Sequence, residues 1–445
     1  MAVVGGGLAG VTAALELAGR GATVVMVERA RVLGGLCRSV ADPVAGRVDT
    51  GQHVYLGCCT ELERLLEQVG AEPAWRQTRL ELVVASPNTG ISRRLRASAL
   101  PPPLHLATML LRWPGLRTRQ LVGTWTVAAA LRSLSPQDEV LLDVVPALAW
   151  LQGLGQDAVA IRRLWEPFLV SACNVPLDSC SARVAAFVIR EGLLQGSAEG
   201  ALRIPKTDLT LWLDPGCRRA LAAAKVELHL GWRATTVQPG AARRYRLLNN
   251  RGDEVEADQL VLSASAHASL GVLRPLGVAD PILEAAASLP QSPIVNLHLF
   301  TDRPFLPGPV VAVPGSPLQW VFDRSQLGER DLDLEGEPIF HSAISLSAAD
   351  EAVSRPEREV VERLWPLCQE LFPAARRARL RHSRVTRERA ATFAAGPGSA
   401  GSRPGPRTTL EGVWLAGAWT DTGWPATMEG AVRSGRRAAL QAALA

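Results

Sequence analysis

Lysine is almost absent from this 445-residue chain: Lys206 and Lys225 are the only two among 48 basic residues. Together with the abundant alanine, the arginine excess is typical of a GC-rich coding bias rather than of a surface selected for phosphate. The net charge is only +5. The densest basic run, Arg376 to Arg389, contains no aromatic residue that would stack on a base. We therefore expect no nucleic-acid partner.

Paired cysteines and long apolar runs are missing as well. The seven cysteines are scattered and form no Cys-x-x-Cys motif, so we expect neither a metal site nor a disulfide framework. No apolar run is long enough to cross a bilayer, and the N-terminus does not resemble a secretory leader. The hydrophobic content of 47% excludes a disordered chain. These features favour a globular protein of the reducing cytoplasm.

The first thirty residues predict a strand, a glycine-rich turn, a helix and a second strand. Ala2 to Val4 is an apolar run, and Gly5, Gly7 and Gly10 follow before residues with helical spacing. Such glycines give a tight turn, a close approach to pyrophosphate and close packing of helix on strand. Glu28 ends the second strand, where a carboxylate binds a ribose diol and disfavours the 2′-phosphate of NADP. This unit predicts a Rossmann-like dinucleotide site but does not separate NAD from FAD.

Features at both ends of the chain favour FAD. Gly34, Gly35 and Arg38 follow the ribose-binding acid and suit a loop on the same pyrophosphate. Far along the chain, a buried strand ends at Gly417, Asp421 follows, and a helical pattern runs from Pro425 to Ala445. Asp421 is placed to bind a ribitol hydroxyl, and the helix N-terminus to stabilise negative charge on a reduced flavin.

The middle of the chain predicts a second domain built from two insertions. We assign residues 1–74, 201–275 and 405–445 to the FAD-binding domain, and residues 75–200 and 276–404 to an α+β substrate domain. Beyond two strands near its start, the first insertion is leucine-rich and helical in pattern, and we expect the second to be of the same kind. The expected fold class is therefore α/β, with a Rossmann-like FAD-binding domain of the glutathione-reductase or amine-oxidase type.

A few residues invite a catalytic interpretation, each with a structural alternative. His53 is a candidate acid near the flavin, although a histidine in a polar turn is more often structural. Cys58-Cys59 has no partner spacing that supports redox chemistry. Trp424, like Trp165 and Trp419, can line an apolar pocket or simply pack in the core. The stretch Leu104 to Leu121 suits either an anionic membrane surface or a buried helix hairpin.

The motifs resemble the FAD-dependent amine oxidase and phytoene desaturase superfamily, and within it the hydroxysqualene dehydroxylases. The resemblance to that branch runs nearly end to end, and its marks are Asp49 to Cys58, Leu164 to Pro167, Asn174 to Pro176, Leu202 to Pro205, Glu388 to Phe393 and Trp424 to Gly435. Lys206, Trp424 and Ala234 depart from the expected residues, and Trp424 puts the pocket shape in doubt. Ala234 takes the place of a valine whose backbone contacts adenine.

The resemblance implies reductive removal of the hydroxyl of hydroxysqualene to give squalene, with an unidentified electron donor and FAD as cofactor. It also implies a polyprenoid partner and a cytoplasmic location, with peripheral contact at the inner face of the cytoplasmic membrane. The rivals are a carotenoid desaturase, an amine oxidase and a non-enzymatic prenyl-lipid carrier. The residues expected to contact FAD are Gly5, Gly7, Leu8, Ala9, Gly10, Glu28, Arg29, Gly34, Gly35, Arg38, Gly51, Gln52, His53, Ala234, Gly417, Asp421, Pro425, Ala426 and Thr427.

Overall fold

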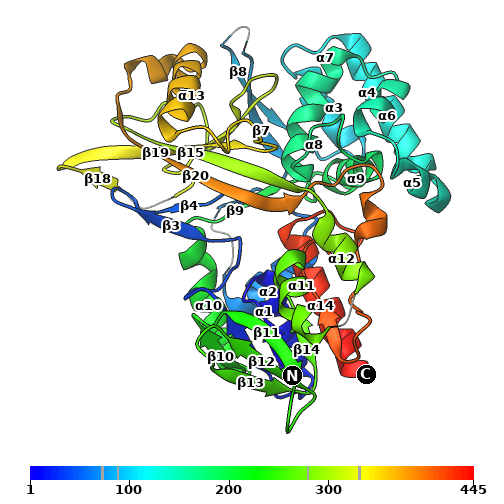
Figure 1. The fold of residues 1–445 in the computed structure, drawn as a ribbon. Helices are drawn as coiled ribbons and strands as arrows, with labels where there is room; N and C mark the ends of the chain where they lie inside the picture. Colours follow the sequence, from blue (N-terminus) through cyan, green and yellow to red (C-terminus); the bar gives the residue numbers. More distant parts are fainter. Residues whose placement is uncertain (72–74, 88–89, 278–279, 329–331) are drawn as a thin grey trace.

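The computed structural model describes residues 1–71, 75–87, 90–277, 280–328 and 332–445. The predicted domain boundary at residue 74 lies outside the described residues. Figure 1 shows two parts of the molecule, which we call the lower body and the upper body. The lower body contains a parallel sheet, and the upper body contains a larger sheet with many helices. Within the described ranges, no helix combines the length and the hydropathy that crossing a membrane would require.

A parallel five-stranded sheet forms the core of the lower body, with β1 at its centre and the order β10-β2-β1-β14-β21. Its members are β1 (Ala2–Val4), β2 (Val25–Glu28), β10 (Glu227–Leu230), β14 (Leu260–Leu262) and β21 (Val413–Leu415). All residues of β1, β14 and β21 are buried, as expected of parallel strands covered on both faces. These strands come from the beginning, the middle and the end of the chain.

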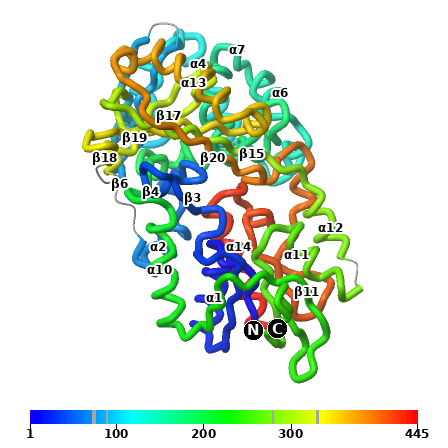
Figure 2. The backbone as a smooth tube through the Cα atoms, turned by 60° about the vertical axis from the view of Figure 1, so that its left-hand side comes forward, coloured from blue at the N-terminus to red at the C-terminus, as the bar shows by residue number. Residues whose placement is uncertain are grey.

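Helices and a small antiparallel sheet cover this parallel sheet. The helices are α1 (Leu8–Gly19), α2 (Thr60–Val69), α10 (Leu209–Ala223), α11 (Ala266–Leu273), α12 (Pro281–Ser288) and α14 (Met428–Leu444), and the sheet is β11 (Ala234–Pro239), β12 (Tyr245–Asn249) and β13 (Glu254–Ala257). Figures 1 and 2 show α1 beside α14, and the two termini lie close together. The first and last elements of the chain therefore form one structural unit.

The upper body contains an eight-stranded, mostly antiparallel sheet. Its strands are β7 (Glu81–Ala85), β8 (Ser92–Arg96), β15 (Gln291–Thr301), β16 (Val310–Val313), β17 (Gln319–Asp323), β18 (Leu332–Leu334), β19 (Glu337–Leu346) and β20 (Leu380–Phe393). α13 (Glu357–Leu371) packs on one face of it. The expectation that the second insertion is mainly helical was therefore wrong. Polar residues interrupt its long strands, so the sequence does not show the regular alternation of apolar and polar residues that indicates a strand.

The first insertion is helical beyond β7 and β8, as expected. Its α-helices are α3 (Ala107–Leu111), α4 (Thr118–Ser133), α5 (Pro136–Leu142), α6 (Ala147–Gly153), α7 (Ala158–Ala160), α8 (Glu166–Cys173) and α9 (Ala182–Ile189). It also contains the 3₁₀-helix η1 (Leu104–Leu106) and the π-helices η2 (Ile161–Trp165) and η3 (Arg190–Leu194). These helices share a buried core of leucine, alanine and tryptophan with the face of the sheet opposite α13.

Short strands join the two bodies. They are β3 (Ser39–Asp42) paired with β4 (Gly46–Asp49), and β5 (Tyr55–Leu56) and β6 (Trp75–Arg76) flanking β9 (Leu202–Ile204). The polar loop of residues 50–54 lies between β4 and β5, at the junction of the two bodies.

Candidate functional site: a dinucleotide cradle

The glycine loop after β1 leads directly into α1. Gly7 is the N-cap residue of α1 and supplies no side-chain cap, so the first N–H groups of α1, beginning at Leu8 and Ala9, receive no side-chain acceptor. A Cβ on Gly10 would lie 1.9 Å from the carbonyl oxygen of Gly5, whereas a Cβ on Gly7 would meet only Gly35, at 3.7 Å. Gly10 is therefore required for packing, while Gly7 leaves space at a helix N-terminus suited to phosphate.

The second glycine loop lies against the first. The Gly34 N–H donates to the Gly6 carbonyl oxygen at 2.8 Å, and Gly34 also pairs with Gly7. Gly34 and Gly35 have φ values of +113° and +63°, in the region that favours glycine. Arg38 follows and forms an ion pair with Glu388 at 3.4 Å. The two loops therefore border one space.

Glu28 lies at the end of β2 with its side chain turned toward the first glycine loop. Its carboxylate accepts hydrogen bonds from the N–H groups of Gly6, at 2.5 Å, and Ala30, at 2.7 Å. A carboxylate has about four acceptor positions, so it can still accept from a ribose diol. Arg29 beside it is exposed, and Ala234 begins β11 shortly after Trp232, whose N–H bonds to the Glu28 carbonyl. The predicted ribose and adenine positions are thus neighbours.

The polar loop containing Gly51, Gln52 and His53 is held from β15. Asn296 donates to the Thr50 carbonyl oxygen at 3.0 Å and accepts from the Gln52 N–H at 3.3 Å. His298 donates through Nε2 to the Asp49 carbonyl oxygen at 3.0 Å, while its Nδ1 lies 3.0 Å from Nε2 of His341. The sequence analysis missed these buried residues. The pattern of polar and apolar residues along a strand does not show which polar side chain will contact a loop.

His53 is half-buried in this loop, and its Nδ1 donates to the Gly51 carbonyl oxygen at 3.0 Å. Burial alone lowers the pKa of His53, but its interaction with the Cys37 side chain and the Gly51 carbonyl outweighs burial and raises the pKa to about 9. At neutral pH the imidazole therefore carries a proton on both nitrogens.

The C-terminal loop reaches the same edge of the parallel sheet. The Gly417 N–H donates to Ser434 Oγ at 2.7 Å, which fastens the end of β21 to α14. Asp421 is exposed, and its carboxylate accepts from the Gly423 N–H at 3.0 Å. Helix α14 begins at Met428, because Thr427 caps it by accepting from the Gly430 N–H. The prediction that Pro425 opens this helix was wrong: Pro425 and Ala426 belong to the turn before the cap.

Arg403 holds this C-terminal loop through three hydrogen bonds to its backbone. The sequence analysis missed this role, because Arg403 lies in a segment rich in glycine and proline that reads as a loop. Its guanidinium donates to the carbonyl oxygens of Thr420, at 2.6 Å, Trp424, at 2.8 Å, and Ala418, at 3.3 Å. Burial lowers the pKa of Arg403 to about 10.

Trp424 lies between α9 and α14. Its ring meets Phe187 edge-on at 5.1 Å, and the guanidinium of Arg433 lies 4.9 Å from the ring centre. Glu429, fully buried in the first turn of α14, accepts from the N–H groups of Glu61 and Leu62 at the start of α2. Trp424 is therefore held in place by α9 and α14, and Glu429 fixes α14 to α2.

The donors present in this space fit FAD. Arg38 Nε, Gln52 Nε2 and Arg403 Nε are buried nitrogens without a hydrogen-bond partner among the described residues. With the uncapped N-terminus of α1 and the Glu28 carboxylate, they offer donors for phosphate and flavin and an acceptor for ribose. Fold and site together define a dinucleotide-binding protein.

Comparisons with known proteins give the family. The chain belongs to the flavin containing amine oxidoreductases, whose family model matches residues 8–443, and its cofactor is FAD. It is 30% identical to the hydroxysqualene dehydroxylase of Rhodopseudomonas palustris, over 98% of this chain and 96% of that protein. It is 25% identical to a zeta-carotene desaturase of Capsicum annuum, over 98% and 80%.

The solved structure of cyclohexylamine oxidase from Brevibacterium oxydans superposes with a TM-score of 0.68 at 17% identity, covering 100% of this chain and 98% of that one. This likeness confirms the FAD-binding amine-oxidase fold. The family membership makes this chain an enzyme rather than a lipid carrier.

Proposed function

We propose that this enzyme removes the hydroxyl group of hydroxysqualene reductively, giving squalene for hopanoid synthesis. The observation that carries the proposal is an almost wholly apolar pocket in the helical part of a chain that resembles hydroxysqualene dehydroxylases over nearly its full length. Fourteen of the fifteen lining residues are apolar, and Thr124 is the exception. A hydrocarbon gains about 0.8 kcal/mol for each CH₂ that it buries in such a pocket.

The FAD site would be held by the residues described above. The first glycine loop and Glu28 would bind the pyrophosphate and ribose, and the 51–53 loop and the turn before α14 would border the flavin. Reduced FAD, when bound, supplies the hydride that replaces the hydroxyl group. The protein must supply the proton, since the C–O bond breaks more easily when its oxygen leaves as water.

We propose His53 as the proton donor. The Gly51 carbonyl accepts from its Nδ1 and fixes the ring, so Nε2 is the nitrogen that would deliver the proton to the substrate. A group with a pKa near 9 is protonated at neutral pH, as a general acid must be. Trp424, in the turn before α14, would form part of the apolar wall. We also propose that an unidentified electron donor reduces the flavin. The enzyme would lie at the inner face of the cytoplasmic membrane.

A carotenoid desaturase is the second candidate, favoured by the similarity to zeta-carotene desaturases. The two functions differ in direction, because desaturation oxidises the substrate and dehydroxylation reduces it. Anaerobic incubation of photoreduced enzyme with hydroxysqualene, followed by chromatography, should yield squalene, and oxidised enzyme with phytoene should yield no product. Desaturated products from phytoene, with no squalene in the first reaction, would reverse the assignment.

A further inference from the structure

We propose that the surface formed by β8, η1, α3 and α4 docks on an anionic lipid bilayer, and that the apolar pocket behind it takes the hydrocarbon directly from the lipid. We call this surface the docking face. The bilayer contact rests on charge and exposure alone, whereas the identity of the hydrocarbon rests on the proposed function.

Charge is distributed very unevenly along the chain. Residues 82–137 contain seven arginines and no aspartate or glutamate, so the rest of the protein carries a net charge of −2. Glu81 and Asp157 pair with three of these arginines, namely Arg94, Arg96 and Arg119. The other four are Arg93, Arg112, Arg117 and Arg132, all exposed. The exposed arginines of this segment, which contains no acidic residue, favour contact of this face with anionic lipid.

Large apolar side chains gather on the same elements. Among the described residues, fifteen large hydrophobic side chains are exposed, and five of them lie on or beside η1, α3 and α4: Leu100, Leu104, Leu111, Val122 and Trp125. Two of the arginines bond to backbone next to these residues, since Arg93 donates to the Arg112 carbonyl and Arg132 donates to the Pro102 carbonyl. Arginine beside exposed leucine and tryptophan is the pattern of a helix that lies in a membrane interface.

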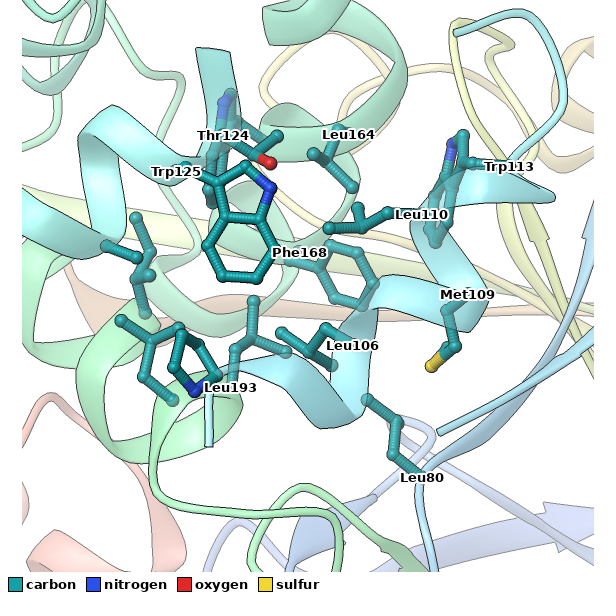
Figure 3. A pocket seen from close by; sticks show the side chains of 15 residues that line it. Leu80, Leu106, Met109, Leu110, Trp113, Thr124, Trp125, Leu164, Phe168 and Leu193 are labelled. Carbon is teal, nitrogen blue, oxygen red and sulfur yellow. The ribbon is translucent and has the colours of Figure 1, made fainter. Parts of the chain in front are cut away.

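The pocket opens at this face. Leu106 of η1, Leu110 of α3 and Trp125 of α4 line it, and Figure 3 shows their side chains around the cavity. Trp125 is also 36% exposed, so the pocket reaches the surface beside its ring.

Helix α9 connects the pocket with the candidate flavin site. Ile189 at its end lines the pocket, while Phe187, two residues earlier, packs on Trp424 in the C-terminal loop. A long hydrocarbon that enters beside Trp125 would therefore need to pass only one helix to reach the residues that border the flavin. A bilayer explains both features of the face together, because its headgroups bind the arginines while its acyl chains meet the exposed leucines.

The first test is binding of the full-length holoenzyme to vesicles. Co-sedimentation is measured with vesicles of phosphatidylcholine mixed with phosphatidylglycerol, and with phosphatidylcholine alone. We expect binding to the mixed vesicles, at least about tenfold weaker binding to the neutral ones, and loss in high salt. Absence of wild-type binding to the mixed vesicles overturns the proposal.

Matched variants locate the contact. Leu111→Asp with Val122→Asp changes two exposed residues that do not line the pocket, and should reduce vesicle binding at least about tenfold. Leu444→Asp, equally exposed at the opposite end of the molecule, should leave binding unchanged. Arg112→Glu with Arg117→Glu should act like the first pair, against Arg20→Glu with Arg274→Glu as the charge control. Equal loss in the control variants would overturn the placement on this face.

Turnover separates this proposal from the proposed function. The docking variants should lose turnover of hydroxysqualene embedded in vesicles but keep the wild-type rate with substrate in detergent micelles. Loss in both media would show that the face does not act through the membrane. Wild-type protein that binds vesicles but makes no squalene in either medium would sink the proposed reaction and leave the docking face standing.

Discussion

Gly435 of α14 lies so close to Ala9 of α1 that a Cβ at position 435 would come within 2.1 Å of the Ala9 carbonyl oxygen. This contact joins the first helix of the chain to the last, although more than four hundred residues separate them. It brings the two predicted halves of the FAD site to the same side of the parallel sheet. The close approach depends on the absence of a side chain.

Gly435→Ala should therefore destabilise the protein by about 1–3 kcal/mol, because the two helices must move apart. Thermal unfolding of the apoprotein measures the effect. Gly19→Ala at the end of α1 is the control, since a Cβ there meets nothing within 4 Å. An unchanged melting temperature for Gly435→Ala would mean that α1 and α14 are not packed as described.

Gly7 and Gly10 should behave in opposite ways, although they lie in one motif. Gly7→Val should keep the apoprotein folded, because its Cβ meets only Gly35 at 3.7 Å, yet abolish FAD retention by filling the phosphate space. Gly10→Ala should fail to fold or lose several degrees of melting temperature. Circular dichroism and bound flavin are measured for both. Normal flavin content in Gly7→Val would move the phosphate site elsewhere.

Removal of the Glu28 carboxylate should weaken FAD binding. Glu28→Ala deletes the expected ribose acceptor and also frees the Gly6 N–H, so we expect a dissociation constant at least about tenfold higher. Glu227→Ala, on the neighbouring strand β10 with a largely exposed carboxylate, serves as the control. Quenching of FAD fluorescence during titration measures both constants. Identical constants would remove Glu28 from the site.

The raised pKa of His53 gives stability a pH dependence. Because its folded-state pKa is about 9 and its unfolded pKa about 6.5, the protonated ring stabilises the fold below pH 6.5. This contribution falls as the pH rises toward 9, by about 3 kcal/mol at most. Denaturant unfolding at several pH values should show the loss in the wild type and a flatter profile in His53→Gln.

Cys37→Ala provides the matching control for His53, because the Cys37 side chain contributes most to raising that pKa. In this variant the inflection of the pH profile should move to lower pH. The same profile in wild type and both variants would exclude a charged His53.

The glycine spacing and Glu28 predicted the nucleotide-binding unit because this signal is local in the sequence. Gly10, for example, must lack a side chain because the Gly5 carbonyl lies against it. The terminal helix was also predicted, although its start was wrongly placed at Pro425 and the Thr427 cap was missed. The Arg403 contacts join residues that lie 15 to 21 positions apart in the sequence. Asn296 and His298 hold the polar loop from almost 250 residues away. No local sequence pattern indicates such pairings. The polar residues Asn296 and His298 of β15 would be read from the sequence as facing solvent, but both are buried.

The stoichiometry of a single anaerobic turnover tests the account most directly. Reduced holoenzyme is mixed with excess hydroxysqualene, and flavin absorbance and squalene are measured in the same sample. We predict one squalene formed for each flavin oxidised, with flavin oxidation absent when squalene replaces the substrate. Flavin that stays reduced, or squalene that forms without flavin oxidation, would contradict the proposed reaction.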